Sequence, residues 1–128
     1  MINFLDFIGR ILISSIFLLS GYNKIFNYNE TVSWMEGFGV PGLLLAPTII
    51  LEVILPLFII VGYKTQITAT LLALFCIVTG MIFHLDFSDQ MQTIQLLKNF
   101  GLAGGFLFIA VNGPKEWALE AKKKYVRL

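Results

Sequence analysis

The chain has 128 residues, of which 57% are hydrophobic and 13% charged, and its formal net charge is +1. A soluble domain of this size needs more charged side chains to cover its surface, so the composition favours helices that face lipid. The length allows about four membrane spans of roughly 20 residues with short connections. We expect a single transmembrane domain over residues 1–128 and no nucleic-acid partner.

Four apolar segments predict an all-α fold, an integral membrane four-helix bundle. The expected spans cover residues 4–26, 43–61, 67–87 and 91–111. Residues 27–42 are too polar to span, but their aromatic side chains suit a loop or short helix at the membrane interface. The fourth span stops at Asn112-Gly113-Pro114, a strong helix terminator.

The positive-inside rule predicts that both termini are cytoplasmic. Four spans place both ends on one side, and the tail over residues 114–128 is basic and can form an amphipathic helix. Lys64 falls on the same side, whereas Glu30 and Glu36 fall on the opposite one. The tail cations at 122–124 and 127 are either a topology signal or a site for anionic lipid head groups.

Several polar and ionisable side chains lie within or at the ends of the expected spans. A charge there costs about 2.5–3.5 kcal/mol at the membrane centre, so such side chains usually face the bundle interior and pair with one another. The candidates for a polar core or ligand site are Arg10, Lys24, Glu52, His84, Lys98 and Asn99.

Helical spacing places small residues beside these polar groups. One face of the first span carries Arg10, Ser14, Phe17, Gly21 and Lys24 at steps of four and three. In the fourth span, Gly101 and Gly105 form a small-xxx-small pattern that favours close helix approach. We therefore expect helix packing at Gly21, Gly101 and Gly105.

Glu52 falls near the membrane midplane and needs a cation or hydrogen-bond donors if it is ionised. Arg10 lies below it and Lys98 above it, and the sequence leaves open which of them pairs with it. Pro56, four residues later, removes the N–H that would bond the carbonyl of Glu52 and predicts a kink. The site is thus either a structural kink with an Arg10–Glu52 pair or a substrate or proton site.

His84 is the only histidine in the chain. A b-type haem in a helical bundle usually takes two axial ligands, so we expect no haem. Partners for zinc or copper are not evident, so we expect no metal. His84 is either an interfacial residue that bonds Asp86 or loop carbonyls, or a ligand or proton-relay group.

Several of these residues fall into elements that resemble the DoxX family of small bacterial four-helix membrane proteins. Arg10-Ile-Leu and the segment Phe17–Phe26 look like the family's R-x-L and F-x-x-x-G-x-x-K-x-F patterns. Phe83–Phe87 looks like F-H-x-x-F, and Lys98–Gly105 looks like K-N-x-x-x-x-G-G. The resemblance implies a multi-pass protein of the bacterial inner (cytoplasmic) membrane. Because some members belong to quinone-linked redox complexes, it also implies at most an accessory subunit of a quinone-linked oxidoreductase.

Three functional hypotheses follow. In the first, the chain binds a quinone or another small amphiphile within a redox-linked complex, with no covalent cofactor and with a redox partner protein. In the second, it is a structural or assembly subunit without chemistry of its own. In the third, it is a carrier of a small solute or protons that acts as a homodimer, because four spans enclose little volume. Apart from such proteins, the partner we expect is the lipid bilayer.

Overall fold

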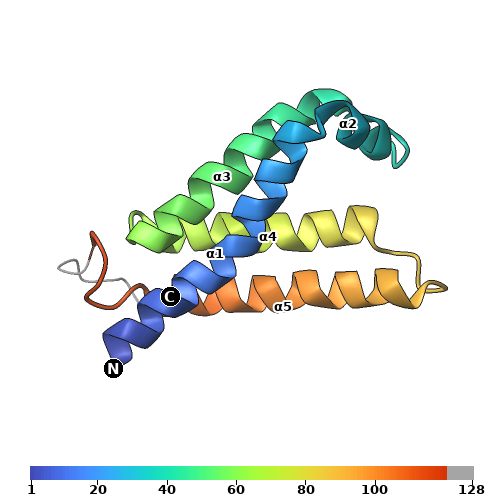
Figure 1. The fold of residues 1–128 in the computed structure, drawn as a ribbon. Helices are drawn as coiled ribbons and strands as arrows, with labels where there is room; N and C mark the ends of the chain where they lie inside the picture. Colours follow the sequence, from blue (N-terminus) through green and yellow to red (C-terminus); the bar gives the residue numbers. More distant parts are fainter. Residues whose placement is uncertain (121–128) are drawn as a thin grey trace.

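The computed structural model describes residues 1–120, and within this range it contains helices and no strand. Figure 1 shows the elements in chain order: α1 (Ile2–Phe26), α2 (Tyr28–Glu36), the 3-10 turn η1 (Gly42–Leu44), α3 (Leu45–Val61), α4 (Thr65–Phe83) and α5 (Gln90–Asn112). Four helical segments are long and apolar enough to cross a membrane, namely α1, η1 with α3, α4 and α5. The protein is therefore an all-α protein with four membrane-spanning helices.

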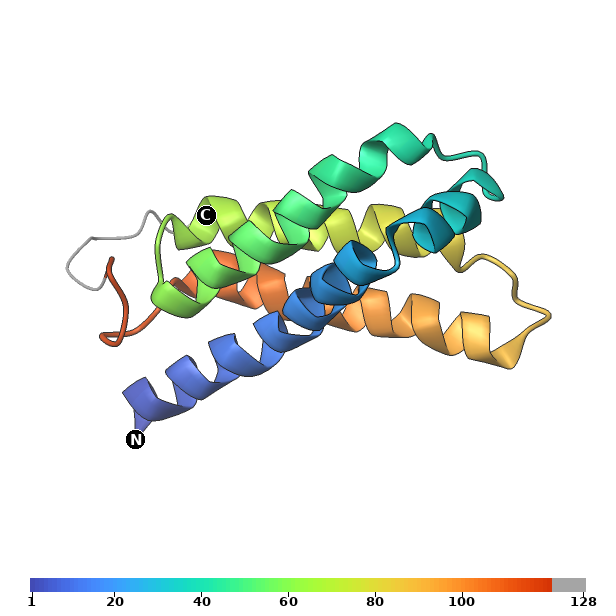
Figure 2. The same ribbon diagram turned by 45° about the horizontal axis from the view of Figure 1, so that its top comes forward.

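The four long helices form two antiparallel pairs. Helix α1 lies along α3, and α4 lies along α5, while the pairs cross each other at an angle (Figures 1 and 2). The pairs meet in a core centred on Phe17 and Phe106, whose ring centroids are 5.5 Å apart. Small residues such as Ala73 and Ala103 are almost fully buried in this core, which lets helix backbones approach closely.

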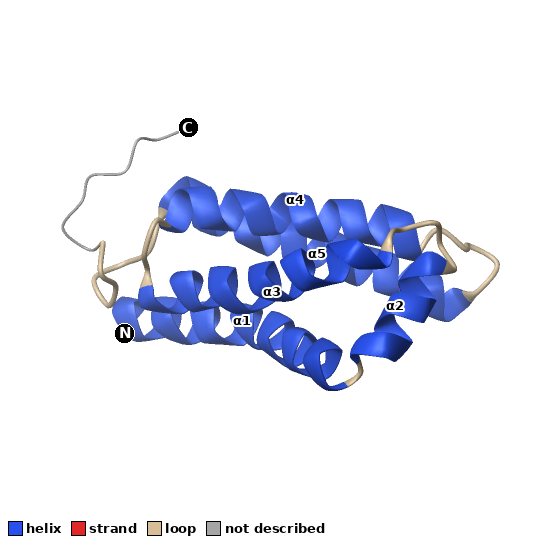
Figure 3. Cartoon of the chain, turned by 90° about the horizontal axis from the view of Figure 1, so that it is seen from above, coloured by secondary structure: helices blue, strands red, loops and turns tan. Residues whose placement is uncertain are grey.

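The two ends of the bundle differ. At one end, here called the tail end, α1 begins and α5 finishes, and Asn3 and Glu116 are joined by hydrogen bonds. At the other, the α2 end, the pairs diverge, and α2 lies beside the space between them (Figure 3). The polar and aromatic stretch after the first span thus contains a short helix of nine residues.

The third long helix, α4, runs from Thr65 to Phe83 and so ends earlier than the expected span over residues 67–87. Two aspartates stabilise the turn after α4 and the start of α5. Asp86 accepts hydrogen bonds from the hydroxyl and the backbone N–H of Ser88, and these bonds hold the pKa of the Asp86 carboxyl below its ordinary value. Asp89 then caps α5 by accepting from the backbone N–H of Met91 at 2.9 Å.

The tail does not form the expected helix over residues 114–120, the part of it that the structure describes. Instead, it crosses the turn between α3 and α4, where the N–H groups of Leu119 and Glu120 donate to the carbonyls of Val61 and Gly62. The cause is a contact with a distant segment, because the backbone of residues 119 and 120 bonds the turn rather than carbonyls of its own segment. The basic residues at 122–124 and 127 lie outside the described residues.

Candidate functional site

Arg10 is almost fully buried at the tail end of the bundle, with 1% of its surface exposed. Its guanidinium donates to Asp6 at 3.0 Å, to the carbonyl of Ile59 at 3.1 Å, and to the carbonyls of Ile60 and Trp117. The planar fork of donors therefore joins α1, α3 and the tail segment. Arg10 does not pair with Glu52, so the hypothesis of an Arg10–Glu52 pair is wrong.

The partner of Glu52 is Lys24. The ammonium nitrogen of Lys24 lies 2.7 Å and 2.8 Å from the two carboxylate oxygens, and Ser20 accepts from the same ammonium at 2.8 Å. The carboxylate is buried, whereas 22% of the Lys24 side chain is exposed. The two charges compensate each other, as the low dielectric of a membrane interior demands.

Gly21 explains how these side chains come together. Ser20 and Lys24 are one helical turn apart on α1, and Gly21 between them is buried against α3. A Cβ added at Gly21 would lie 2.9 Å from a methyl group of Val53 and 3.5 Å from Cβ of Glu52. The absence of a side chain thus lets α1 approach α3 closely enough for the ion pair to form.

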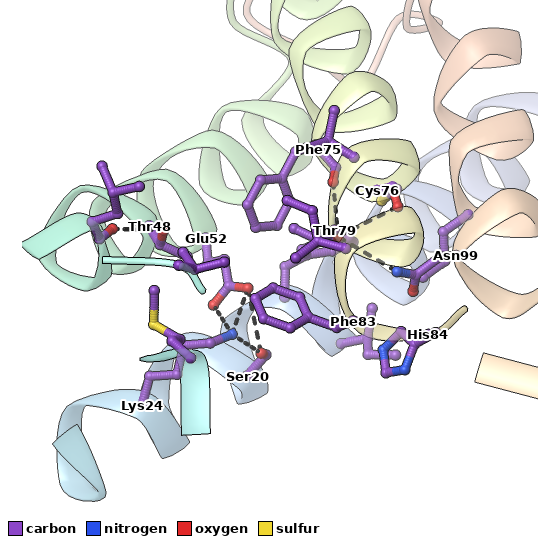
Figure 4. A pocket seen from close by; sticks show the side chains of 18 of the residues that line it. Ser20, Lys24, Thr48, Glu52, Phe75, Cys76, Thr79, Phe83, His84 and Asn99 are labelled. Atoms are coloured by element: carbon purple, nitrogen blue, oxygen red, sulfur yellow. Dashed lines mark hydrogen bonds and ion pairs between the residues drawn. The ribbon is translucent and has the colours of Figure 1, made fainter. Parts of the chain in front are cut away.

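A cavity of about 330 Å³ opens between the two helix pairs at the α2 end. Most of its lining is apolar, and its polar groups lie on two walls (Figure 4). One wall carries Lys24, Glu52 and Ser20 from the α1/α3 pair. The facing wall, on the α4/α5 side, carries Cys76, Thr79, His84 and Asn99.

The polar groups of the α4/α5 wall are held by local bonds. The Thr79 hydroxyl donates to the carbonyl of Phe75 at 2.8 Å, and the Asn99 amide donates to the Thr79 hydroxyl at 3.4 Å. Nδ1 of His84 lies 2.6 Å from the amide oxygen of Gln92. His84 therefore bonds a side chain of α5, which corrects the expectation that it bonds Asp86 or a loop carbonyl.

Helix α2 and the segment directly after it cover the end of the cavity with side chains that were not among the expected site residues. The ring of Trp34 stacks on Phe83 with centroids 4.5 Å apart, and Phe38 meets Phe83 edge-on at 5.2 Å. Trp34 and the buried Met35 both line the cavity. The available signal was the spacing of Trp34 and Phe38, one helical turn apart in an otherwise polar stretch.

Two expected members of the site lie elsewhere. Lys98 is exposed on α5, does not line the cavity and does not pair with Glu52. Its neighbour Asn99 points to the cavity because successive residues of a helix are rotated by about 100°. Gly101 is also exposed, with no atom within 4 Å of a Cβ placed there, whereas Gly105 would meet Ile13 at 2.8 Å.

The cavity can bind a ligand through hydrogen bonds and apolar contacts. Over residues 1–120, no group of three or more His, Cys, Asp or Glu side chains lies close enough to hold a metal ion. The arrangement can instead donate from Lys24 and Asn99 to a polar head group, while aromatic and aliphatic side chains enclose an apolar body.

Four apolar helices around a cavity with polar walls define a small multi-pass membrane protein. The chain belongs to the DoxX family, whose model matches residues 5–85. It is 35% identical to the inner membrane protein YqjF of Escherichia coli over 88% of this chain and 87% of that protein. It is 30% identical to the inner membrane protein YphA of the same organism over 90% of this chain and 87% of that protein.

No solved structure matches the chain. The four apolar helices and the names of both relatives agree with the location expected from the sequence. The protein is a multi-pass protein of the bacterial inner membrane.

Proposed function

We propose that the protein binds a quinone, or another small uncharged amphiphile, in the cavity between its helix pairs, as the membrane subunit of a redox-linked complex. The observation that carries this proposal is the polarity of the cavity, which has hydrogen-bonding groups on two walls and apolar side chains elsewhere. Its volume of about 330 Å³ falls at the lower end of the range for small-molecule sites, which is roughly 300–1,000 Å³.

The residues fit a quinone head group. Quinone carbonyls accept hydrogen bonds, and the amide of Asn99 can donate from one wall. On the other wall, the ammonium of Lys24 can donate by exchanging its bond to Ser20 for one to the quinone. Phe17, Phe75 and Leu102 supply apolar surface for the ring and for the start of an isoprenoid chain. Such a quinone would supply the redox chemistry, and the part of this chain would be to bind and orient it.

Tryptophan fluorescence gives a direct test. The chain has two tryptophans, and Trp34 lines the cavity whereas Trp117 lies at the tail end. Purified Trp117→Phe protein should show quenching of Trp34 when a short-chain ubiquinone analogue is added. Asn99→Leu in that background should weaken binding by about two- to tenfold, because one hydrogen bond contributes about 0.5–1.5 kcal/mol.

Lys98→Leu is the matched control, since it removes a polar side chain next to Asn99 that does not line the cavity. It should leave the quenching curve unchanged. Equal binding by the parent protein, the Asn99 variant and a Lys24→Met variant would remove the cavity from the proposal.

A second candidate function, a structural or assembly subunit, is favoured by the exposure of Lys98 within the first half of a membrane-spanning helix. A lysine there is costly in lipid and is better accommodated beside a partner protein, either a redox partner or a second copy of the chain. Lys98→Leu should then abolish co-purification of a fixed partner without lowering the melting temperature of the isolated protein.

We also propose that both termini lie in the cytoplasm. The proposal is supported by the hydrogen bonds between Asn3 and Glu116, which place the start and the tail of the chain at the same end of the bundle. The positive-inside rule predicts that this end of the bundle lies on the cytoplasmic side of the membrane. A reporter fused to the C-terminus that is active only outside the cytoplasm would reverse this orientation.

A further inference from the structure

A second hollow lies on the flank of α1, beside the cavity. It has a volume of about 420 Å³ and is more open to the surroundings than the cavity. Its lining consists of Ile16, Leu19, Ser20, Asn23, Lys24, Asn27 and Thr31. We call this hollow the flank groove.

The flank groove and the cavity share three lining residues, Ile16, Ser20 and Lys24. The two hollows are therefore neighbours, separated by the side chains that hold Glu52. The side chain of Lys24 is 22% exposed although its partner Glu52 is almost fully buried. The ammonium thus lies at the boundary between the surface of the bundle and its interior.

The groove becomes more polar toward the α2 end. Ile16, Ser20 and Asn23 follow one another at steps of four and three along one face of α1. Asn27, between α1 and α2, and Thr31 of α2 line the groove beyond them. Ser20 lies six residues before the end of α1 at Phe26, or about 9 Å along the axis. Polar side chains thus extend from the end of the helix to the depth of the ion pair.

We infer that the flank groove is a polar entrance through which water and an uncharged head group reach the Lys24–Glu52 pair from the α2 end. The use of this entrance by a ligand rests on the proposed function, whereas the access of water does not. Polar side chains facing lipid are costly, so a continuous line of them indicates contact with water or with a polar ligand.

The charges of the groove indicate which head groups it accepts. Its other polar side chains are amides and hydroxyls, and the charge of Lys24 is already compensated by Glu52 at 2.7 Å. A carboxylate or phosphate would find no uncompensated cation among these lining residues. A neutral head group with carbonyl or hydroxyl groups can exchange hydrogen bonds with Ser20, Asn23 and Lys24.

Cysteine labelling tests the access of water. In a Cys76→Ala background, Ser20→Cys and Asn23→Cys place thiols in the groove. Leu97→Cys places one on an exposed, apolar site of α5, seven residues after that helix begins at Gln90. A charged, membrane-impermeant thiosulfonate is added to either side of proteoliposomes. Only a hydrated thiolate reacts with this reagent. When the reagent is added on the side of the membrane where the α2 end lies, both groove thiols should react at least about tenfold faster than the Leu97→Cys thiol.

Labelling of Ser20→Cys no faster than that of Leu97→Cys would overturn the entrance. Asn23 has an exposed side chain, so Asn23→Cys keeps the test valid if Ser20→Cys does not fold. In that case, labelling of Asn23→Cys no faster than that of Leu97→Cys would overturn the entrance.

Protection experiments separate the entrance from the ligand. A short-chain ubiquinone analogue should slow the labelling of Ser20→Cys several-fold, whereas a fatty acid anion of similar length should not. Stronger protection by the anion would overturn the inferred preference for neutral head groups. Fast labelling that neither compound slows would support the entrance for water and contradict the proposed quinone site.

Discussion

The ammonium of Lys24 on α1 lies 2.7 Å and 2.8 Å from the two carboxylate oxygens of Glu52 on α3. The pair joins the first two long helices at the edge of the cavity and adds no net charge to the membrane interior. It is therefore both a structural link and part of one polar wall of the proposed site.

The first prediction concerns the coupling between these two charges. Lys24→Met or Glu52→Gln alone should lower stability, because breaking a buried pair leaves an uncompensated charge and costs about 3–5 kcal/mol. The double variant removes both charges, so its loss should be clearly smaller than the sum of the two single losses. Thermal unfolding of the three variants in detergent measures this coupling. Strictly additive losses would show that the pair is not coupled.

The second prediction compares two glycines. Gly21→Ala should destabilise the protein by about 1–3 kcal/mol, because the new Cβ would lie 2.9 Å from Val53 and force the helices apart. Gly101→Ala should be neutral or stabilising by up to about 1 kcal/mol, since nothing lies within 4 Å and alanine favours helix. Melting temperatures of both variants provide the measurement. Equal effects at the two positions would contradict the packing described here.

The four membrane-spanning helices could be predicted from the sequence because runs of about 20 apolar residues are typical of helices that cross a bilayer. The position of Lys24 on the same face of α1 as Gly21 also follows from helical spacing. The partner of Glu52 could not be predicted from depth in the membrane. Depth places Arg10 and Lys98 on either side of Glu52 but does not show which helix faces meet. Pairing depends on which faces meet, and α1 and α3 meet at Gly21.

The remaining differences involve contacts between distant segments. The tail was expected to be an amphipathic helix, but residues 114–120 bond the turn between α3 and α4. No local pattern reveals such a contact, since its partners are more than 50 residues apart. The contact between Trp34 and Phe83, which covers the cavity, also joins residues far apart in the sequence. In addition, aromatic residues in a polar stretch are typical of an interfacial anchor, so they do not by themselves indicate a site.

The third prediction concerns the turn between α4 and α5. The hydroxyl and the N–H of Ser88 stabilise the ionised form of Asp86 and so lower its pKa. Because the pKa in the folded state lies below the unfolded value, the stabilisation of the turn is complete above the unfolded pKa. It is lost as the pH falls through the folded pKa.

Ser88→Ala should raise the pKa of Asp86 toward its ordinary value, whereas Ser88→Thr should retain the shift. Carbon NMR titration of the carboxyl group distinguishes the two, and an unchanged pKa in the alanine variant would contradict the assigned bond.

The fourth prediction concerns Glu120, which ties the tail to the start of α4. Its carboxylate accepts the backbone N–H groups of Lys64 at 2.6 Å and of Thr65 at 3.0 Å, two of the donors that the first turn of a helix leaves without helical partners. Glu120 thus acts as a helix cap from a distant segment, and an anion at this position also matches the helix dipole.

Glu120→Ala should therefore destabilise the protein by about 0.5–2 kcal/mol, the usual cost of losing a cap. Hydrogen exchange of the Lys64 and Thr65 amides should increase, while that of amides in the middle of α5 should not. Glu116→Ala is the matched control, because Glu116 is exposed and its carboxylate accepts a long hydrogen bond from the Asn3 amide at 3.3 Å. If the two alanine variants showed the same melting temperature and the same exchange at Lys64, the tail would not stabilise α4.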